Sequence, residues 1–305
     1  MGMAALHAGA HVFFEKPFTP FPAQADELLA EAAARGLRCA VAHQVRMQPS
    51  ALFLRQQIEA GLIGELLEVS AIGSCDRRAG GEEMMILGCH VFDMVRMLVG
   101  TEPEWCTARI LQGGKEVTPA DIREQGEVLA QNEPGQKLTE AIGPLIGDEI
   151  NAQFSFGGGV HVSYTSRHRQ EGVSALGISF RLIGSKGVAR MEWGLPPRLY
   201  VLQREDLKEE DAGFGPSTDR WVPIVGDPTG PGDDRPLGTG EETMADATER
   251  LVSDWLRAIE EGREPFASAS NGAKAIEMIC AVFEAGLTRE RVAMPLANRE
   301  HPLAR

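Results

Sequence analysis

The chain has 305 residues, of which 43% are hydrophobic and 24% are charged, and its formal net charge is −14. These values are typical of a globular chain that is long enough for two domains and a substantial buried core. The negative charge disfavours nucleic acids and anionic membranes as partners, and no apolar run is long enough to cross a bilayer.

Cysteine usage argues against a disulfide framework, because the count is odd and no pair has C-x-x-C spacing. The first residues lack the pattern of a signal peptide. A cytoplasmic protein with reduced thiols is therefore expected, although an export signal in a preceding segment would change that expectation. The histidines and cysteines show no recognisable metal-ligand spacing, so no metal is expected.

The first 45 residues alternate helix and strand signals. A helix is predicted to end at residues 4–8, followed by a strand at 11–14, a helix at 26–35 and a strand at 38–42. Strand–helix–strand is the repeating unit of a doubly wound sheet. An open parallel sheet needs more strands, so we interpret residues 1–45 as the remnant of a nucleotide-binding domain. The alternative is a small two-stranded appendage docked on the rest of the chain.

Residues 46–305 predict a second domain, an open and mainly antiparallel sheet with helices on one face. The polar segment at 112–143 is predicted to be an excursion loop with a short helix, and 209–240 a surface loop or a partly disordered segment. Gly80-Gly81 is predicted to mark another loop. The predicted helices and strands are helices 48–60, 86–99, 245–261 and 272–289, with Leu251, Trp255, Leu256 and Ile259 turned inward in the third, and strands 66–74, 152–156, 160–166, 181–183, 188–192 and 199–203.

Lys16 is the first candidate for chemistry. It follows an apolar strand, at the edge where open α/β sheets build their sites. Pro17 restricts the backbone of Lys16, and the neighbouring Glu15 can tune the charge of the lysine. A partly desolvated lysine there can exchange a proton near neutral pH. The other interpretation is a surface lysine at a strand end, and the tripeptide alone does not separate the two.

His90 and Asp93 form a second candidate, on one face of the predicted helix together with Ile86 and Met97. A carboxylate one turn away can orient a histidine that acts as a general acid or base. Taken alone, a partly buried histidine beside a local aspartate is the more common explanation.

His43, Gln44 and Arg46 directly follow the second predicted strand. Polar side chains at that edge of the sheet would face the same crevice as Lys16. A solvated loop is the equally plausible alternative.

In this order the segments resemble the Gfo/Idh/MocA family, which includes glucose–fructose oxidoreductase and inositol dehydrogenase. Ala8–Pro17, AGAHVFFEKP, is similar to the family's AGKHVxxEKP, and Gly88–Asp93, GCHVFD, is similar to its GxHxxD. The resemblance continues through residues 58–64, 180–192 and 255–265 and the last predicted helix, and so covers nearly the whole chain.

The resemblance implies a domain that holds NAD or NADP and a sheet domain that supplies the substrate pocket and the interface of a homo-oligomer. It implies oxidation of a sugar, cyclitol or polyol hydroxyl, or the reverse reaction. By resemblance, Lys16 and His90, helped by Asp93, handle the hydroxyl proton. Glu15, Lys16, Pro17 and Gln44 would lie near the cofactor, and His43, Arg46 and His90 near the substrate.

The chain departs from the family in two places. The Gly-rich phosphate loop would lie upstream of residue 1, which we expect to reflect a late start or a cut chain. The family often has an aspartate four residues before the histidine, and here that position is Ile86. Two alternatives therefore remain open at this stage: a binding or oligomerising module without a nucleotide site, and a cofactor-free lyase or hydrolase that acts on carbohydrate.

Overall fold

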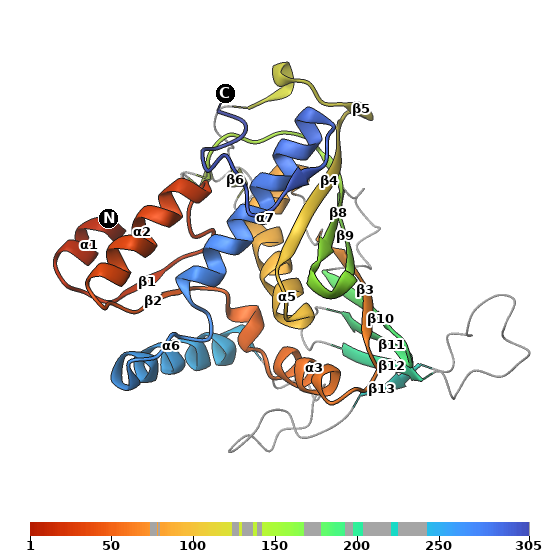
Figure 1. The fold of residues 1–305 in the computed structure, drawn as a ribbon, viewed down its shortest axis with the longest axis horizontal. Coiled ribbons are helices and arrows are strands. Elements are labelled where there is room, and N and C mark those ends of the chain that lie inside the picture. Colours follow the sequence, from red (N-terminus) through yellow and green to blue (C-terminus); the bar gives the residue numbers. More distant parts are fainter. Residues whose placement is uncertain are drawn as a thin grey trace, which may run out of the picture.

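A computed structural model describes residues 1–73, 78, 80–123, 128–129, 137–138, 142–167, 178–192, 198–203, 221–224 and 243–304 of the chain. Figure 1 shows the N-terminal elements and most helices on one side of the molecule and a long sheet on the other.

The N-terminal elements form the predicted strand–helix–strand unit. The strands β1 (Val12–Phe14) and β2 (Cys39–Val41) pair in parallel, with Phe13 opposite Ala40. The helices α1 (Gly2–His7) and α2 (Pro22–Ala34) lie on one side of this pair (Figure 1). Pro22 suits the first turn of α2, where a missing N–H costs no hydrogen bond.

A ten-stranded sheet dominates the rest of the chain, in the order β13-β12-β11-β10-β3-β9-β8-β4-β14, with β5 beside β4. Its neighbours are antiparallel except β3 and β9, which are parallel. A separate short pair is formed by β6 (Val128–Leu129) and β7 (Lys137–Leu138). The strands of the large sheet are β3 (Leu66–Ile72), β4 (Pro103–Gln112), β5 (Lys115–Glu116), β8 (Glu149–Phe156), β9 (His161–Arg167), β10 (Ser179–Gly184), β11 (Gly187–Glu192), β12 (Arg198–Gln203), β13 (Val222–Pro223) and β14 (Val292–Ala293).

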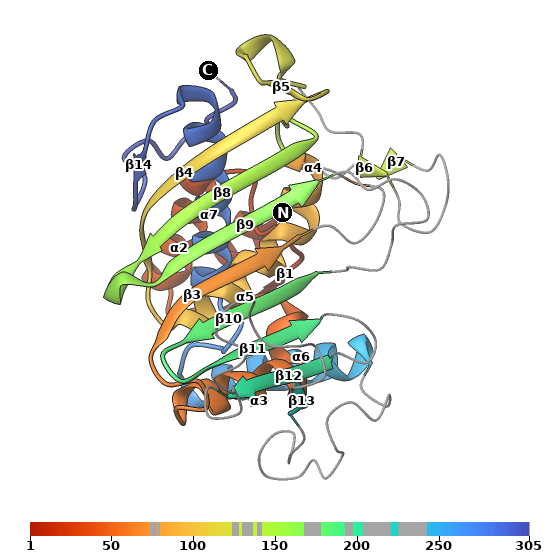
Figure 2. The same cartoon turned by 90° about the vertical axis from the view of Figure 1, so that its right-hand side faces the viewer.

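The helices that pack on this sheet all lie on one of its faces, which confirms the predicted architecture (Figures 1 and 2). A core of large side chains, including Phe92, Phe154, Tyr164 and Phe283, fills the space between α5, α7 and the strands. The helices are α3 (Pro49–Glu59), α4 (Gly80–Glu83), α5 (Cys89–Val99), α6 (Met244–Glu261) and α7 (Ala269–Thr288), with short turns η1 (Gln44–Met47), η2 (Met84–Gly88), η3 (Pro119–Asp121) and η4 (Gly157–Gly159).

The C-terminal third of the chain returns to the N-terminal unit. The indole N–H of Trp255 in α6 donates to the carbonyl of Arg38 at 3.1 Å. The amide of Val41 in β2 donates to the carbonyl of Ala267 at 2.9 Å. Arg299, after α7, forms a two-point ion pair with Asp26 in α2 at 2.7 Å. The two ends of the chain are thus packed together.

Several predictions were wrong in detail. Gly80-Gly81 begins α4 rather than a loop, because both glycines pack closely on the backbone of residues 146–148. Leu256 in α6 is 50% exposed rather than turned inward. The strand β4 was not predicted, since it begins at a proline and its burial does not alternate regularly. The predicted loop at 209–240 lies outside the described residues apart from 221–224, and much of 112–143 does too.

Candidate active site

Lys16 lies directly after β1, where its half-buried side chain reaches across to the start of α5. Its ammonium donates a hydrogen bond to the main-chain carbonyl of Ile86 at 3.0 Å. The neighbouring Glu15 is exposed, and its carboxylate accepts the Lys16 amide N–H at 3.3 Å rather than the ammonium. Pro17, joined to Lys16 by a cis peptide, is half-buried. Of this tripeptide, Lys16 is the residue whose side chain reaches the segment that leads into α5. Lys16, His43, Arg46, His90 and Asp93 are called the cluster below.

The acceptor of Lys16 belongs to η2, a π-helical turn that leads into α5. Such turns shift the backbone hydrogen bonds by one residue and are frequent at functional sites. The side chain of Ile86 is buried, and its carbonyl also accepts a weak hydrogen bond from the Cys89 thiol, with the sulfur at 3.5 Å. At the position where the family often has a carboxylate, this chain therefore presents a backbone oxygen to the lysine.

His43 and His90 meet edge to face close enough to Lys16 to sense its charge. Their ring centroids are 5.3 Å apart at an interplanar angle of 84°, and both side chains are buried. The pKa of His43 is lowered to about 4, chiefly by burial, with Asp93 raising it and the charges of Arg46 and Lys16 lowering it. Burial, His43 and Lys16 hold the pKa of His90 well below its usual value. Both imidazoles are therefore neutral at pH 7 and can accept a proton.

Arg46 and Asp93 form a buried ion pair next to the histidines. A guanidinium nitrogen of Arg46 lies 3.1 Å from a carboxylate oxygen of Asp93, and both side chains are almost fully buried. The Arg46 guanidinium also lies over the Phe266 ring, 4.9 Å from its centroid. Asp93 thus neutralises Arg46 and raises the pKa of His43. The orientation of His90 by Asp93 stays a prediction.

Gln44 lies one residue after His43, at the start of η1. Its side chain is half-buried, and its Oε1 atom is buried without a hydrogen-bond partner among the described residues. The Nδ1 atom of His43 is also buried and has no hydrogen-bond partner among the described residues. Buried polar atoms are normally paired, so two orphaned atoms at the end of β2 fit a site that receives polar groups from a ligand.

A second buried pair, Glu83 with Tyr164, was missed from the sequence. The Tyr164 hydroxyl donates to the Glu83 carboxylate at 2.8 Å, and both side chains are buried. Burial first, and then Glu83, raises the pKa of Tyr164 well above its usual value. One sequence signal was available: Glu83 directly precedes the apolar run Met84–Leu87, and a charged residue there needs a partner if the run is buried.

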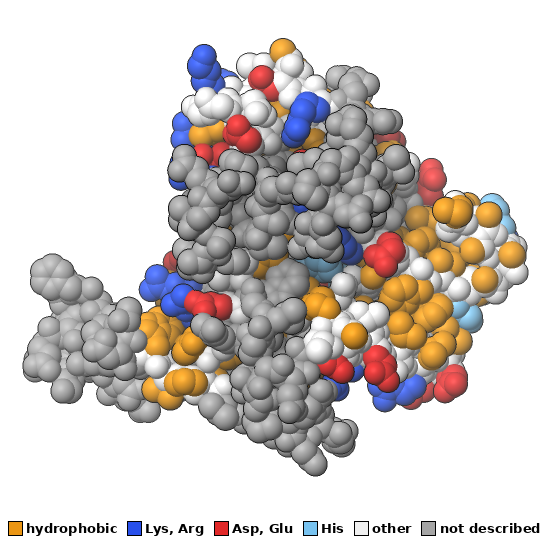
Figure 3. Space-filling view, turned by 180° about the vertical axis from the view of Figure 1, so that it is seen from behind, with side chains coloured by type: hydrophobic (Ala, Val, Ile, Leu, Met, Phe, Trp, Pro, Cys, Tyr) orange, Lys and Arg blue, Asp and Glu red, His pale blue; other side chains and the backbone are white. Residues whose placement is uncertain are grey.

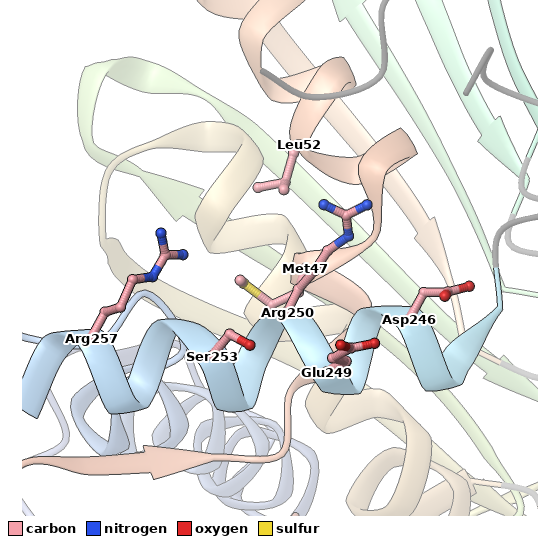
Figure 4. A pocket seen from close by; sticks show the side chains of 7 residues that line it. All are labelled: Met47, Leu52, Asp246, Glu249, Arg250, Ser253 and Arg257. Atoms are coloured by element: carbon pink, nitrogen blue, oxygen red, sulfur yellow. The ribbon is translucent and has the colours of Figure 1, made fainter. Parts of the chain in front are cut away.

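A pocket of about 410 Å³ lies apart from this cluster, between η1, α3 and α6 (Figure 4). One of its lining residues, Met47, directly follows Arg46 in η1. Its charged side chains are of both signs, so it does not favour a ligand of one charge. The described residues that line it are Met47, Leu52, Asp246, Glu249, Arg250, Ser253 and Arg257.

Two further sequence predictions concern metals and membranes. In the described part of the chain, no group of histidine, cysteine, aspartate and glutamate side chains is arranged to hold a metal ion. Within the same residues, no helix combines the length and apolar character that spanning a membrane requires. Cys39, Cys89, Cys106 and Cys280 are buried free thiols, and Cys75 lies outside the described residues.

Comparison with known proteins identifies the class. Residues 1–43 match the oxidoreductase family's NAD-binding Rossmann fold, and residues 55–294 match its C-terminal α/β domain. The fold and these matches define the class as a family of oxidoreductases with a mixed α/β architecture. The chain belongs to the Gfo/Idh/MocA oxidoreductase family, as its sequence motifs indicated.

Individual relatives agree with this assignment. An uncharacterized oxidoreductase of Schizosaccharomyces pombe is 26% identical over 71% of the chain, and the chain spans only 55% of that relative. The UDP-N-acetylglucosamine 3-dehydrogenase of Acidithiobacillus ferrooxidans is 35% identical over 32% of the chain and 31% of its own length. The chain thus spans about half or less of these curated relatives.

Solved structures with the same fold include an oxidoreductase domain protein from Kribbella flavida. It has a TM-score of 0.71 and 23% identity, over 96% of the chain and 77% of its own. A levoglucosan dehydrogenase in complex with NADH and levoglucosan has a TM-score of 0.69 and 19% identity, over 96% of the chain and 76% of its own. At these identities the likeness establishes the fold.

Proposed function

We propose that the protein is an NAD(P)-dependent dehydrogenase or reductase that acts on a hydroxyl of a sugar, cyclitol or related polyol. In this proposal residues 1–45 belong to the nucleotide-binding domain and residues 46–305 form the substrate and oligomerisation domain. Relatives named for levoglucosan and for UDP-N-acetylglucosamine support a carbohydrate substrate. The NADH complex of a protein with the same fold supports a nicotinamide cofactor.

The end of β2 offers groups that fit such a cofactor. The orphaned Oε1 of Gln44 can accept a hydrogen bond from an amide, and half-buried Pro17 gives an apolar surface beside Lys16. We assign Glu15, Lys16, Pro17 and Gln44 to the cofactor side of the site. When bound, the nicotinamide supplies hydride transfer, and the protein's part is to orient the reactants and move the hydroxyl proton.

Lys16 and His90 are the groups that we assign to that proton. His90 is neutral at pH 7 because it is buried beside His43 and Lys16, so it can accept a proton from a hydroxyl. Lys16 places a positive charge near the oxygen on which negative charge develops. Asp93 neutralises the charge of Arg46, so that Arg46 adds little net positive charge to that of Lys16. His43, Arg46 and His90 are the residues assigned to the substrate side.

The observation that carries this proposal is the convergence of Lys16, His43 and His90, from the ends of two parallel strands and the start of α5, on one buried cluster. Titration of the chain with NADH, followed by fluorescence, tests cofactor binding directly. Turnover of a panel containing levoglucosan and UDP-N-acetylglucosamine, with and without nicotinamide, tests the reaction. Absence of NADH binding would favour the oligomerising module, and turnover without nicotinamide would favour the lyase or hydrolase.

We also propose that the large sheet forms the interface of a homo-oligomer. The described helices cover one of its faces, and none of them lies on the other face, which is turned to the viewer in Figure 2. That face carries short polar side chains around a shallow hollow of about 400 Å³, including Asn151, Ser163 and Thr165. Sedimentation of the parent chain and of a Ser163→Arg variant tests this proposal. A charge within a self-complementary interface is expected to dissociate the oligomer.

A further inference from the structure

We propose that the hydrogen bond between Glu83 and Tyr164 positions Lys16, by fixing the π-helical turn η2 whose Ile86 carbonyl holds the lysine ammonium. This inference rests on the proposed function, since it gives Lys16 its orientation for proton handling. Glu83 and Tyr164 are positioning residues in this scheme, because they act on Lys16 through the backbone.

Tyr164 contacts η2 at both of its ends. At the N-terminal end, Glu83 is the residue that precedes the turn, and its carboxylate accepts the Tyr164 hydroxyl at 2.8 Å. At the C-terminal end, a Cβ added to Gly88 would lie 2.8 Å from the same hydroxyl oxygen. One phenol group therefore fixes the beginning of the turn by a hydrogen bond and its end by close packing.

The neighbouring strand closes the other side of the pair. A Cβ added to Gly73, just after β3, would lie 2.5 Å from the Tyr164 hydroxyl and 2.8 Å from the Glu83 carboxylate. The Tyr164 ring packs on Phe92 of α5, with centroids 4.6 Å apart. Between these contacts the hydroxyl has little freedom to move, so its hydrogen bond can fix the turn in one conformation.

Ile86 lies between the two fixed ends, and its carbonyl is the atom that receives the Lys16 ammonium at 3.0 Å. The position of this carbonyl depends on the conformation of the turn to which it belongs. With no carboxylate at position 86, the direction of the Lys16 side chain depends on this backbone oxygen, and through it on the Tyr164 hydroxyl.

The test measures how strongly Lys16 is held, without cofactor or substrate. The full chain is labelled with a small amount of acetic anhydride at one pH, and acetylation of Lys16 is measured by mass spectrometry relative to exposed Lys186. Tyr164→Phe removes the hydroxyl and keeps the ring. We expect Lys16 labelling to rise about fivefold, the factor that loss of one net hydrogen bond represents.

The chain has two tyrosines, and Tyr200→Phe in β12 of the same sheet provides the matched control, expected to leave Lys16 labelling within about twofold of the parent. Glu83→Gln keeps an acceptor oxygen for Tyr164 and is expected to behave like the control. Equal Lys16 labelling in Tyr164→Phe and Tyr200→Phe, with both variants folded by circular dichroism, would overturn the proposal.

If Tyr164→Phe does not fold, Gly88→Ala replaces it, because the added methyl group displaces the turn from the hydroxyl. Unchanged Lys16 labelling in a folded Gly88→Ala variant would also overturn the proposal. None of these measurements needs nicotinamide binding, so a failure of the proposed function is seen separately in the NADH titration. With an active sugar, Tyr164→Phe is expected to lower kcat and leave KM unchanged.

Discussion

The ammonium of Lys16 reaches the backbone carbonyl of Ile86, 70 residues later in the chain, at 3.0 Å. This contact joins the end of β1 in the N-terminal unit to the helical segment that carries His90. The cluster of lysine and histidines therefore exists only when both parts of the chain are in place.

Replacing Lys16 with Met tests the proton-handling role. Turnover of an active sugar is expected to fall about 10²–10⁴-fold, the usual contribution of one acid–base group, while the dissociation constant for NADH changes little. Steady-state kinetics and fluorescence titration measure the two effects. Lys186→Met, at the exposed β10–β11 turn, is the control, and an equal effect of both variants would contradict the assignment.

The buried pair of Arg46 and Asp93 is expected to show strong coupling. Arg46→Met leaves a buried carboxylate without its cation, which typically costs about 3–5 kcal/mol of the free energy of unfolding. The double variant with Asp93→Asn should recover part of that loss. Urea unfolding of the parent, the two single variants and the double variant gives the coupling energy.

A surface pair provides the comparison for that cycle. Arg109 and Glu116 approach to 3.4 Å with side chains 61% and 46% exposed, so Arg109→Met is expected to cost less than about 1 kcal/mol. Equal losses in the free energy of unfolding for Arg46→Met and Arg109→Met would show that the buried pair stabilises the fold no more than an exposed pair does.

Stability is expected to fall as the pH is lowered from about 6.5 to about 4. Burial lowers the pKa of His43 and of His301 from 6.5 to about 4. Above pH 6.5 these groups are neutral in both states, so their contribution is complete. As the pH falls below 6.5, the unfolded chain binds protons that the folded chain does not, and stability is lost until about pH 4.

Each such histidine contributes at most about 1.4 kcal/mol per pH unit to this slope. Urea unfolding at several pH values measures it, and His301→Gln is expected to make the slope shallower by one histidine's share. His301 lies between the rings of Phe21 and Phe283, away from the candidate site. A slope that is the same in both proteins would mean that His301 is accessible to protons in the folded state.

The buried thiols are expected to resist alkylation. Burial raises the pKa of Cys39, and raises that of Cys89 to about 12, so little reactive thiolate forms. Peptide mapping after iodoacetamide treatment should show Cys39, Cys89, Cys106 and Cys280 unmodified in the folded chain and modified in urea. Rapid labelling of Cys89 without urea would show that the start of α5 opens readily.

Regular elements were predictable where the sequence marks their ends. The α5 helix ends at Gly100, which has a φ of 77°, and α6 ends at Gly262, with a φ of 69°; glycine adopts such angles at low cost. The strand β4 carries no comparable marker, and its residues face helix α7 on one side without regular alternation. Only the surrounding sheet makes a strand of it.

The candidate site was partly predictable for a similar reason. Lys16 and His43 come together because the ends of neighbouring parallel strands meet at one edge of a sheet. The partner of Asp93 was not predictable, because α5 is buried on nearly every side and Arg46 approaches it from η1. Glu83 and Tyr164 are 81 positions apart in the chain, so no local sequence pattern could predict that they pair.

The return of the C-terminal third to the N-terminal unit has a consequence for synthesis. During translation, β2 leaves the ribosome more than 200 residues before Trp255 and Ala267, to which it and its flanking turn are hydrogen-bonded. The contacts that α6 and the residues after it make with the β1–α2–β2 segment are therefore missing while the chain is being made, and Figure 3 shows apolar side chains gathered on that side of the finished molecule. Chaperone dependence and aggregation of nascent chains should accordingly be concentrated in the interval before α6 emerges.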